Sequence, residues 1–292
     1  MSLVEQAIAR MRNQARALAP NLVDAGSKPA APPPIVDRLS PPAPGAEKHM
    51  SLDMDALRAR GYLPEAGEDR RFADHYRRIK RPLIDKAMSG ITGIGEPSVI
   101  MITSALPGDG KTFTSVNLAL SMALERDVSV LLVDCDVAKR HISDIVGLKE
   151  ERGLLDVLVD DSLDIESMVV QTGLRGLSIL PAGRRVEATA ELLSSNRMRH
   201  IVTHLCKRNP RRIVLLDSPP LLITNEGRAL LKAAGQVVLV VRAGHTPRQA
   251  VQDALGLFDA RQAGGIILNQ VPESRTEGYY GYGSYGTAGD AT

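Results

Sequence analysis

The sequence predicts an α/β protein with a mostly parallel sheet covered by helices on both faces, which gives three layers. The first observation is an alternation of short apolar runs with helix-like segments, regular from Val99 onward. Strands that are apolar on both faces are typical of parallel sheets buried between helices. The second observation is a glycine-rich turn between the first of these runs and a helix-like segment, at the edge where such sheets bind ligands.

The N-terminal part differs in composition from the rest of the chain. Residues 2–19 have helical spacing, with apolar residues on one face and arginines on the remainder, and such a helix either docks on a partner or a membrane surface or frays. Residues 20–48 are rich in Pro and Ala, and they have little to bury in return for roughly 1–2 kcal/mol of backbone entropy per residue. Residues 49–67 are ambiguous. We therefore expect residues 1–67 to form an N-terminal helix and a mostly disordered linker.

One folded domain is expected over residues 68–271. It begins with a charged helix over residues 68–90, in which Pro82 predicts a break or a kink followed by a second short segment. Apolar runs predict strands over residues 98–103, 129–133, 177–180, 212–216, 236–241 and 265–269. Helical periodicity predicts helices over residues 112–125, 187–208, 223–234 and 247–261.

Composition limits the classes of protein that the chain can represent. The formal net charge of +2 gives no electrostatic reason to expect nucleic acid as a partner. Two cysteines, Cys135 and Cys206, are too few for a disulfide framework, so a reduced cytoplasm is the simplest interpretation. No apolar run approaches the 18 or so residues that predict a membrane span.

The glycine-rich turn over residues 104–112 is nearly the phosphate-binding pattern G-x-x-x-x-G-K-[ST], with Ala105 in place of the first glycine. Gly108 and Gly110 allow successive backbone N–H groups to point at phosphate oxygens. Lys111 would reach the β- and γ-phosphates, and Thr112 would hold Mg2+. The alternative is a strand–helix turn that binds nothing. The expected nucleotide-binding residues in this loop are Pro107, Gly108, Asp109, Gly110, Lys111, Thr112 and Phe113.

Acidic residues end two of the predicted strands. Asp134 and Asp136 follow one apolar run, and Asp217 follows another. The carboxyl ends of parallel strands share one edge of a sheet, so these carboxylates should converge beside the turn. Mg2+ prefers oxygen ligands, and we expect Asp136 and Asp217 to hold it together with the Thr112 hydroxyl. Asp134 would accept or orient the proton of an attacking hydroxyl, which makes Lys111, Asp134 and Asp136 the candidate catalytic residues. The alternative is that these acids only cap the following turns.

The C-terminal segment over residues 272–292 is rich in Gly and Tyr and is expected to be a flexible tail. Glycines between the tyrosines oppose packing and keep the phenols exposed. The cluster fits either phospho-acceptors or a sticky segment used for stacking. The candidate phospho-acceptors are Tyr279, Tyr280, Tyr282 and Tyr285.

Together these motifs resemble those of the bacterial tyrosine kinases (BY-kinases) of polysaccharide export. The family carries three Walker-type motifs and a C-terminal tyrosine cluster, and the subgroup most similar to this chain is that of the exosortase-associated autokinases. The resemblance spans about residues 70–286. It rests on residues 105–112, 130–136, 215–220, 153–158, 180–183 and 191–193 and on the tail.

The resemblance implies a P-loop NTPase fold and an ATP- and Mg2+-dependent protein-tyrosine autokinase that regulates exopolysaccharide synthesis and export. A tail tyrosine, from a neighbouring subunit or from the same chain, would take the γ-phosphoryl group. Asn269, at the end of the last predicted strand, would contact adenine. The implied partners are other copies of the chain, in a homo-oligomer such as a ring, and a separate membrane chain-length-determinant protein that activates the kinase. The implied location is the cytoplasm, at the periphery of the inner membrane.

Two positions depart from the family pattern. The second Walker-type motif usually has Arg two residues after its last Asp, where this chain has Ala138 followed by Lys139 and Arg140. The helical Glu-x-x-Arg-x-x-Arg pattern of ring assembly is present only as Asp74, Arg77 and Lys80. Lys does not replace Arg at a bidentate contact, so this pattern does not fix the size of the oligomer.

Two other functions compete with the kinase. An ATPase switch of the ParA/MinD type has a similar fold but usually carries an extra Lys early in the P-loop, and Leu106 occupies that position. The missing Lys, the Asp-x-Pro-Pro motif at Asp217 and the tyrosine tail all favour the kinase. The third possibility is a catalytically weak scaffold whose nucleotide only stabilises assembly.

Overall fold

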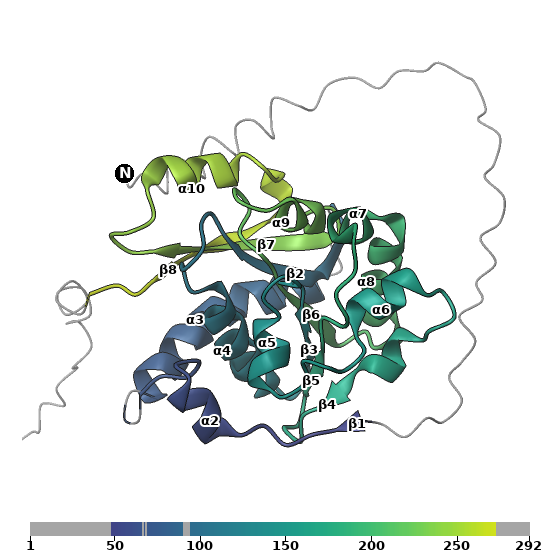
Figure 1. Ribbon diagram of the computed structural model, residues 1–292. Coiled ribbons are helices and arrows are strands. Elements are labelled where there is room, and N and C mark those ends of the chain that lie inside the picture. The colour runs from purple at the N-terminus through teal and green to yellow at the C-terminus, as the bar shows by residue number, and fades with distance from the viewer. Residues whose placement is uncertain (1–47, 66, 68, 90–93, 273–292) are drawn as a thin grey trace, which may run out of the picture.

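An eight-stranded sheet forms the centre of the computed structural model (Figure 1). The structure describes residues 48–272, apart from residues 66, 68 and 90–93. The strand order is β1-β4-β5-β3-β6-β2-β7-β8, and neighbouring strands are parallel except for the antiparallel pair β4 and β5. The strands are β1 (Lys48–His49), β2 (Glu96–Ser104), β3 (Ser129–Asp134), β4 (Val170–Gln171), β5 (Leu177–Leu180), β6 (Arg212–Asp217), β7 (Ala234–Arg242) and β8 (Ala263–Asn269).

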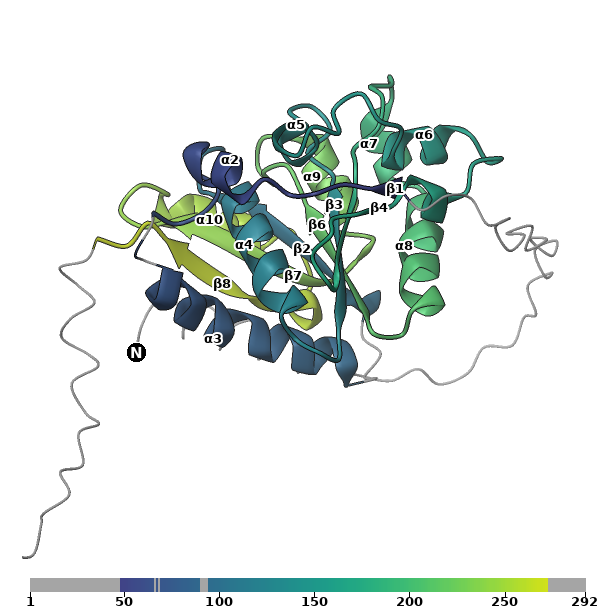
Figure 2. The same cartoon turned by 90° about the horizontal axis from the view of Figure 1, so that it is seen from below.

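Helices cover both faces of this sheet, which confirms the predicted three-layer α/β fold (Figure 2). One face packs against α2 (Met54–Ala59), α3 (Asp69–Met88), α4 (Lys111–Ala123) and α5 (His141–Ile145). The other face packs against α6 (Leu154–Val159), α7 (Thr189–Ser194), α8 (Asn196–Arg208), α9 (Asn225–Leu230) and α10 (Arg248–Leu255). Two 3-10 turns, Ile165–Met168 and Ala260–Gln262, complete the described elements.

Strand β2 illustrates why the predicted strands are apolar throughout. Val99 and Met101 belong to the core on one side of the sheet, whereas Ile100 and Ile102 belong to the core on the other side, and all four are fully buried. Burying such side chains contributes about 1.5–3 kcal/mol each. The six predicted strands are all present, and β2 lies between β6 and β7, so the turn that follows β2 opens at the middle of the sheet.

The break predicted at Pro82 is wrong, because α3 runs as one helix from Asp69 to Met88. A proline inside a helix costs about 3 kcal/mol, so contacts elsewhere must compensate. Lys80, before the proline, forms an ion pair with Glu125. Leu83, after it, is buried against the sheet, and its carbonyl oxygen accepts a hydrogen bond from Gln236. These contacts hold the helix on the domain on both sides of Pro82.

The helix predicted over residues 187–208 is two helices, because Ser195 ends α7 and begins α8. Its backbone is extended, with φ −69° and ψ 160°. Its hydroxyl accepts a hydrogen bond from the Met198 N–H and donates one to the Leu192 carbonyl oxygen. A serine that satisfies the backbone groups of two helix ends is a stable boundary that helical periodicity does not reveal.

The folded part begins earlier than the predicted boundary at residue 68. Strand β1 pairs with β4, and α2 follows it. Leu57 and Leu63 are buried, with 3% and 8% of their surface exposed. The stretch around them has no clear periodic pattern, yet Leu57 packs against α4 and the sheet. The helix predicted over residues 2–19, nearly all of the linker and the tail with its four tyrosines lie outside the described residues.

Within the described ranges, no helix combines the length and the apolar character that crossing a membrane requires.

Candidate nucleotide-binding site

The turn between β2 and α4 has the geometry of a phosphate-binding loop. Gly108 and Gly110 have φ values of 85° and 93°, in the left-handed region that favours glycine. Gly110 is also restricted by space, because an added Cβ would lie 2.0 Å from Nδ2 of Asn269. Helix α4 begins at Lys111, so its free N–H groups and the positive end of its dipole face the loop.

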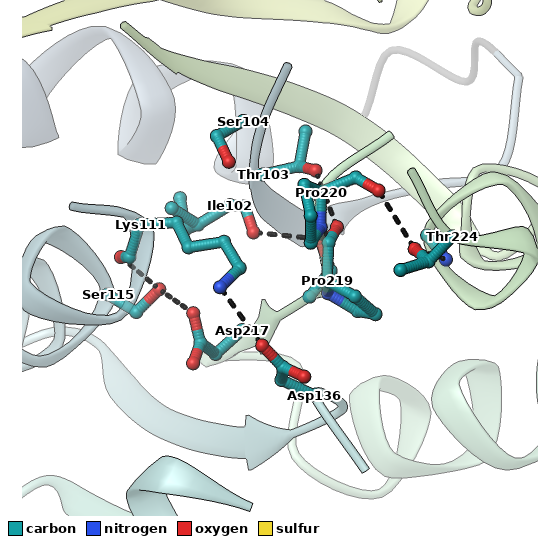
Figure 3. A network of polar contacts seen from close by, with 12 residues as sticks. Ile102, Thr103, Ser104, Lys111, Ser115, Asp136, Asp217, Pro219, Pro220 and Thr224 are labelled. Atoms are coloured by element: carbon teal, nitrogen blue, oxygen red, sulfur yellow. Dashed lines mark hydrogen bonds and ion pairs between the residues drawn. The ribbon is translucent and has the colours of Figure 1, made fainter. Parts of the chain in front are cut away.

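Lys111 and the predicted metal-binding acids lie together at the carboxyl ends of the central strands (Figure 3). Lys111 Nζ is 2.9 Å from Oδ2 of Asp136, and both side chains are almost fully buried. Asp217 Oδ1 accepts a hydrogen bond of 2.8 Å from the hydroxyl of Ser115. Asp134 and Asp217 are directly paired in the register of β3 and β6. The predicted convergence of these residues is therefore confirmed, whereas their individual roles stay predictions.

Burial makes Asp217 an unusual carboxylate. Desolvation raises its pKa to about 7, although Lys111, Ser115 and Thr112 act to lower it. Its Oδ2 is buried and makes no hydrogen bond to any described residue. A buried oxygen without a partner is costly unless a cation or a donor is supplied from outside. This carboxylate, whose pKa the Thr112 hydroxyl lowers, fits the oxygen ligand set that Mg2+ prefers.

Asp134 accepts hydrogen bonds from Ser143, a residue that the sequence analysis did not identify. The N–H and the hydroxyl of Ser143 both donate to Asp134 Oδ2, at 2.8 and 2.7 Å, and the Ser143 hydroxyl in turn accepts from the Ala182 N–H. Burial raises the pKa of Asp134 to about 6, and the hydrogen bonds from Ser143 lower it. One carboxylate oxygen is therefore committed to the fold, which leaves Oδ1 for any chemistry. The sequence shows no pattern that links Ser143 to Asp134 or to Ala182, which lies 39 residues away.

Three predicted nucleotide-binding residues use their side chains in contacts within the protein. Asp109 accepts a hydrogen bond from Thr246, and the ring of Phe113 packs edge-on against that of Phe72 at 5.7 Å between centroids. These two residues can serve phosphate only through their backbone N–H groups. Asn269 Nδ2 donates to the carbonyl oxygen of Asp109 at 3.0 Å, so the amide lies against the phosphate loop, and its contact with adenine stays a prediction.

The motif that follows β6 is hydrogen-bonded to strand β2, which leads into the phosphate loop. The Ser218 hydroxyl donates to the Ile102 carbonyl oxygen, and the Thr103 hydroxyl donates to that of Pro219 (Figure 3). The Thr224 hydroxyl donates to the Pro220 carbonyl oxygen and caps α9. The backbone around Asp217 is thus fixed relative to β2, which keeps the carboxylate in register with Lys111.

The two departures from the family pattern have clear positions. Arg140, with φ 51°, donates to the carbonyl oxygens of Lys149 and Gly183, so its guanidinium braces the loop after β3. Lys139 is exposed and is the cation of this loop that faces solvent. Lys80 is buried and donates to the Ser121 carbonyl oxygen besides its ion pair with Glu125, so this member of the ring-assembly pattern is engaged inside the chain.

A family model described as an AAA domain matches residues 97–260. Tyrosine-protein kinase Wzc of Salmonella typhimurium is 31% identical over 190 residues, which cover 64% of this chain and 26% of Wzc. The chain thus matches about a quarter of the length of that relative. Tyrosine-protein kinase YwqD of Bacillus subtilis is 32% identical over 186 residues, which cover 62% of this chain and 77% of YwqD.

Solved structures agree with these matches. The BceF tyrosine kinase domain superposes with a TM-score of 0.60 and 28% identity over 77% of this chain and 92% of that domain. The kinase domain of Escherichia coli tyrosine kinase ETK superposes with a TM-score of 0.62 over 81% of this chain and 94% of that domain, and at 23% identity it supports the fold alone. The phosphate loop, the strand-end acids and these matches lead to one conclusion: the chain belongs to the AAA-domain family and, within it, to the bacterial tyrosine-protein kinases.

Proposed function

We propose that this chain is an ATP-dependent protein-tyrosine autokinase that phosphorylates its own C-terminal tyrosine cluster and thereby regulates exopolysaccharide synthesis and export. The observation that carries the proposal is the convergence of Lys111 with Asp134, Asp136 and Asp217 beside the glycine turn. Phosphoryl transfer is catalysed mainly by positioning and by charge neutralisation, and this edge of the sheet offers both.

The residues present fit a bound Mg2+–ATP. The backbone N–H groups of residues 107–113 would bind the phosphates, and Lys111 would turn from Asp136 toward the β- and γ-phosphates. Thr112, Asp136 and Asp217 would hold Mg2+, which neutralises negative charge on the phosphates when it is bound. The buried, unpartnered Oδ2 of Asp217 supports this assignment.

Asp134 would receive or orient the proton of the attacking tyrosine. A carboxylate whose pKa is raised to about 6 is a better proton acceptor near neutral pH than an ordinary aspartate. Ser143 fixes one oxygen of this carboxylate, so the other has a defined direction. The phenol oxygen would attack the γ-phosphorus in line with the β–γ bridging oxygen, that P–O bond would break to release ADP, and the phenol proton would pass to Asp134.

The acceptor tyrosines are Tyr279, Tyr280, Tyr282 and Tyr285. Strand β8 ends at Asn269, whose side chain touches the phosphate loop, so the tail starts at the same edge of the sheet as the nucleotide. A flexible segment of about 15 residues spans roughly 20–23 Å, which allows transfer within one chain or between neighbours. Phosphorylated tails would repel one another and acidic neighbours, so phosphorylation would loosen the oligomer.

We infer the partners from the family alone. Other copies of this chain would form a homo-oligomer such as a ring. A separate membrane chain-length-determinant protein would activate the kinase and hold it, as a cytoplasmic protein, at the periphery of the inner membrane. The exosortase-associated subgroup is the proposed placement within the family. Nucleic acid is not a proposed partner.

One experiment separates the kinase from its two competitors. Purified protein is incubated with Mg2+ and γ-labelled ATP, and wild type is compared with Lys111→Met, with the four tail tyrosines changed to Phe, and with Lys232→Met. Lys232 is exposed and precedes β7, so it lies at the opposite edge of the sheet and controls for the loss of a positive charge. The kinase requires label on the tail of wild type and of Lys232→Met and no label on the other two.

The competing functions give different results. Phosphate release from wild type without label on the protein would favour an ATPase switch. Nucleotide-dependent assembly without either product would favour a scaffold. Sedimentation of the protein with and without phosphorylation then tests the regulatory step, and identical assembly in both states would contradict it.

A further inference from the structure

Asp109 places a carboxylate inside the predicted phosphate-binding loop. It lies between Gly108 and Gly110, within the backbone segment proposed to bind the phosphates, and only 4% of its surface is exposed. A carboxylate next to a triphosphate repels it, and a low dielectric strengthens the repulsion. The loop can bind a nucleotide only if this charge is directed elsewhere and compensated.

The structure shows how the Asp109 carboxylate is held. The hydroxyl of Thr246 donates to Oδ1 at 2.7 Å, and the N–H of Leu106 lies 3.3 Å from Oδ2. The Thr246 hydroxyl itself accepts a hydrogen bond from the Arg242 N–H at 2.9 Å, so its single proton is free for Asp109. Hydrogen bonds to an ionised acceptor are stronger than neutral ones, particularly in a buried position.

The position of Thr246 explains why it serves this purpose. It follows β7, the strand beside β2, and lies in the connection that leads to α10. Asn269, at the end of the next strand, holds the Asp109 carbonyl oxygen from the same side. The Asp109 side chain is therefore drawn toward the β7 side of the sheet and toward the start of the loop, while Lys111 points toward β3 and Asp136.

We propose that Thr246 is a positioning residue for nucleotide binding: its hydroxyl holds the Asp109 carboxylate away from the phosphate site. The inference deepens the proposed function and rests on it, since it assumes that the loop binds ATP. Without the hydroxyl, Oδ1 is a buried charged atom that has lost its strongest donor, and the carboxylate turns to the nearest remaining donors, the loop N–H groups. There it competes with the phosphates and repels them.

The test measures the affinity of a fluorescent ATP analogue in wild type, Thr246→Val and Thr246→Ser. Valine keeps the shape and removes the hydroxyl, whereas serine keeps the hydroxyl. We expect Thr246→Val to weaken ATP binding roughly tenfold, the size of effect that one lost charge-assisted hydrogen bond produces. Thr246→Ser should bind ATP like wild type. Because the cause is repulsion, the loss should be largest for ATP, smaller for ADP and smallest for AMP.

A double mutant isolates the charge. In the Asp109→Asn background no carboxylate is present to repel phosphate, so adding Thr246→Val should change ATP affinity less than twofold. Thermal unfolding checks that each variant is folded, and the AMP affinity gives a second check. An equal loss for ATP, ADP and AMP, or the same loss in the Asp109→Asn background, would assign Thr246 a merely structural role.

A failure of the role of Thr246 and a failure of nucleotide binding give different results. Wild type that binds ATP while Thr246→Val binds it equally well overturns the role of Thr246 and leaves the nucleotide site intact. Wild type that binds no nucleotide overturns the proposed function and this inference with it.

Discussion

Replacing Asp217 with Asn should stabilise the nucleotide-free protein and abolish its activity. Asparagine has the shape of aspartate and still accepts the hydrogen bond from Ser115, but it carries no charge to desolvate. The pKa of Asp217 is raised from 3.8 to about 7, chiefly by burial. Each pKa unit corresponds to about 1.4 kcal/mol, so ionised Asp217 costs the folded protein about 4 kcal/mol.

The sign of the pH dependence follows from this shift. Between pH 3.8 and about 7 the unfolded chain releases the Asp217 proton, whereas the folded protein retains it. The free energy of unfolding of wild type therefore falls as the pH rises through this window, and the full cost is present above it. Asp134, whose pKa is raised to about 6, adds a dependence of the same sign. The slope in Asp217→Asn should thus be shallower than in wild type but not zero.

Thermal unfolding at pH 5 and pH 8 measures this prediction. For a domain of this size about 4 kcal/mol corresponds to roughly 8–16 °C, so Asp217→Asn should melt higher than wild type at pH 8 by several degrees or more. Added Mg2+ and ATP should stabilise wild type and leave Asp217→Asn little changed. An Asp217→Asn variant that melts lower than wild type at pH 8, or a wild type equally stable at both pH values, would refute the reasoning.

Three further substitutions test the arrangement around the site. Ser143→Ala removes one of the two donors to Asp134, and we expect about 1–2 kcal/mol lower stability and a lower kcat with little change in KM for ATP, measured by denaturant unfolding and steady-state kinetics. Gly110→Ala places a Cβ 2.0 Å from Asn269 in a left-handed backbone and should abolish binding of fluorescent ATP. Lys80→Met removes a buried cation that joins α3 to α4 and should lower stability by about 1–3 kcal/mol without changing the oligomer measured by sedimentation.

Each of the three substitutions has a control variant or a result that would contradict the prediction. Ser143→Thr retains the hydroxyl and should restore kcat, and a failure to do so would assign the loss to packing. Gly108→Ala meets no atom within 4 Å and should be milder than Gly110→Ala, so equal losses would leave backbone conformation as the only cause. If the Lys80→Met protein is as stable as wild type but assembles differently, Lys80 acts at the subunit interface instead.

Features set by the local sequence could be predicted, whereas contacts made only in the folded chain could not. Strand β2 and the glycine turn could be predicted because burial on both faces demands an apolar run, and the turn demands positive φ at Gly108 and Gly110. Ser143 and Thr246 could not, because each acts on an aspartate through a contact that only the folded chain creates. Thr246 lies 137 residues from Asp109. In the sequence, neither residue belongs to a motif that would distinguish it from other serines and threonines.

The start of the folded part before residue 68 and the continuity of α3 at Pro82 could not be predicted for a related reason. Leu57 stands in a stretch without a clear periodic pattern, and its burial depends on a space between α4 and the sheet that other segments define. Pro82 breaks a helix in isolation, but Lys80 and Leu83 are fixed by contacts with distant parts of the chain. In both cases tertiary contacts outweigh the preference of the local sequence.

The ion pair between Lys111 and Asp136 has a thermodynamic consequence for how ligands enter. Both side chains are almost fully buried, so separating them without another partner would leave an unpaired buried charge. When the Lys111 ammonium group turns from Asp136 toward an incoming triphosphate, Asp136 needs another cation to balance its charge. Nucleotide and divalent cation should therefore bind cooperatively, because each has a higher affinity for the site when the other is already bound.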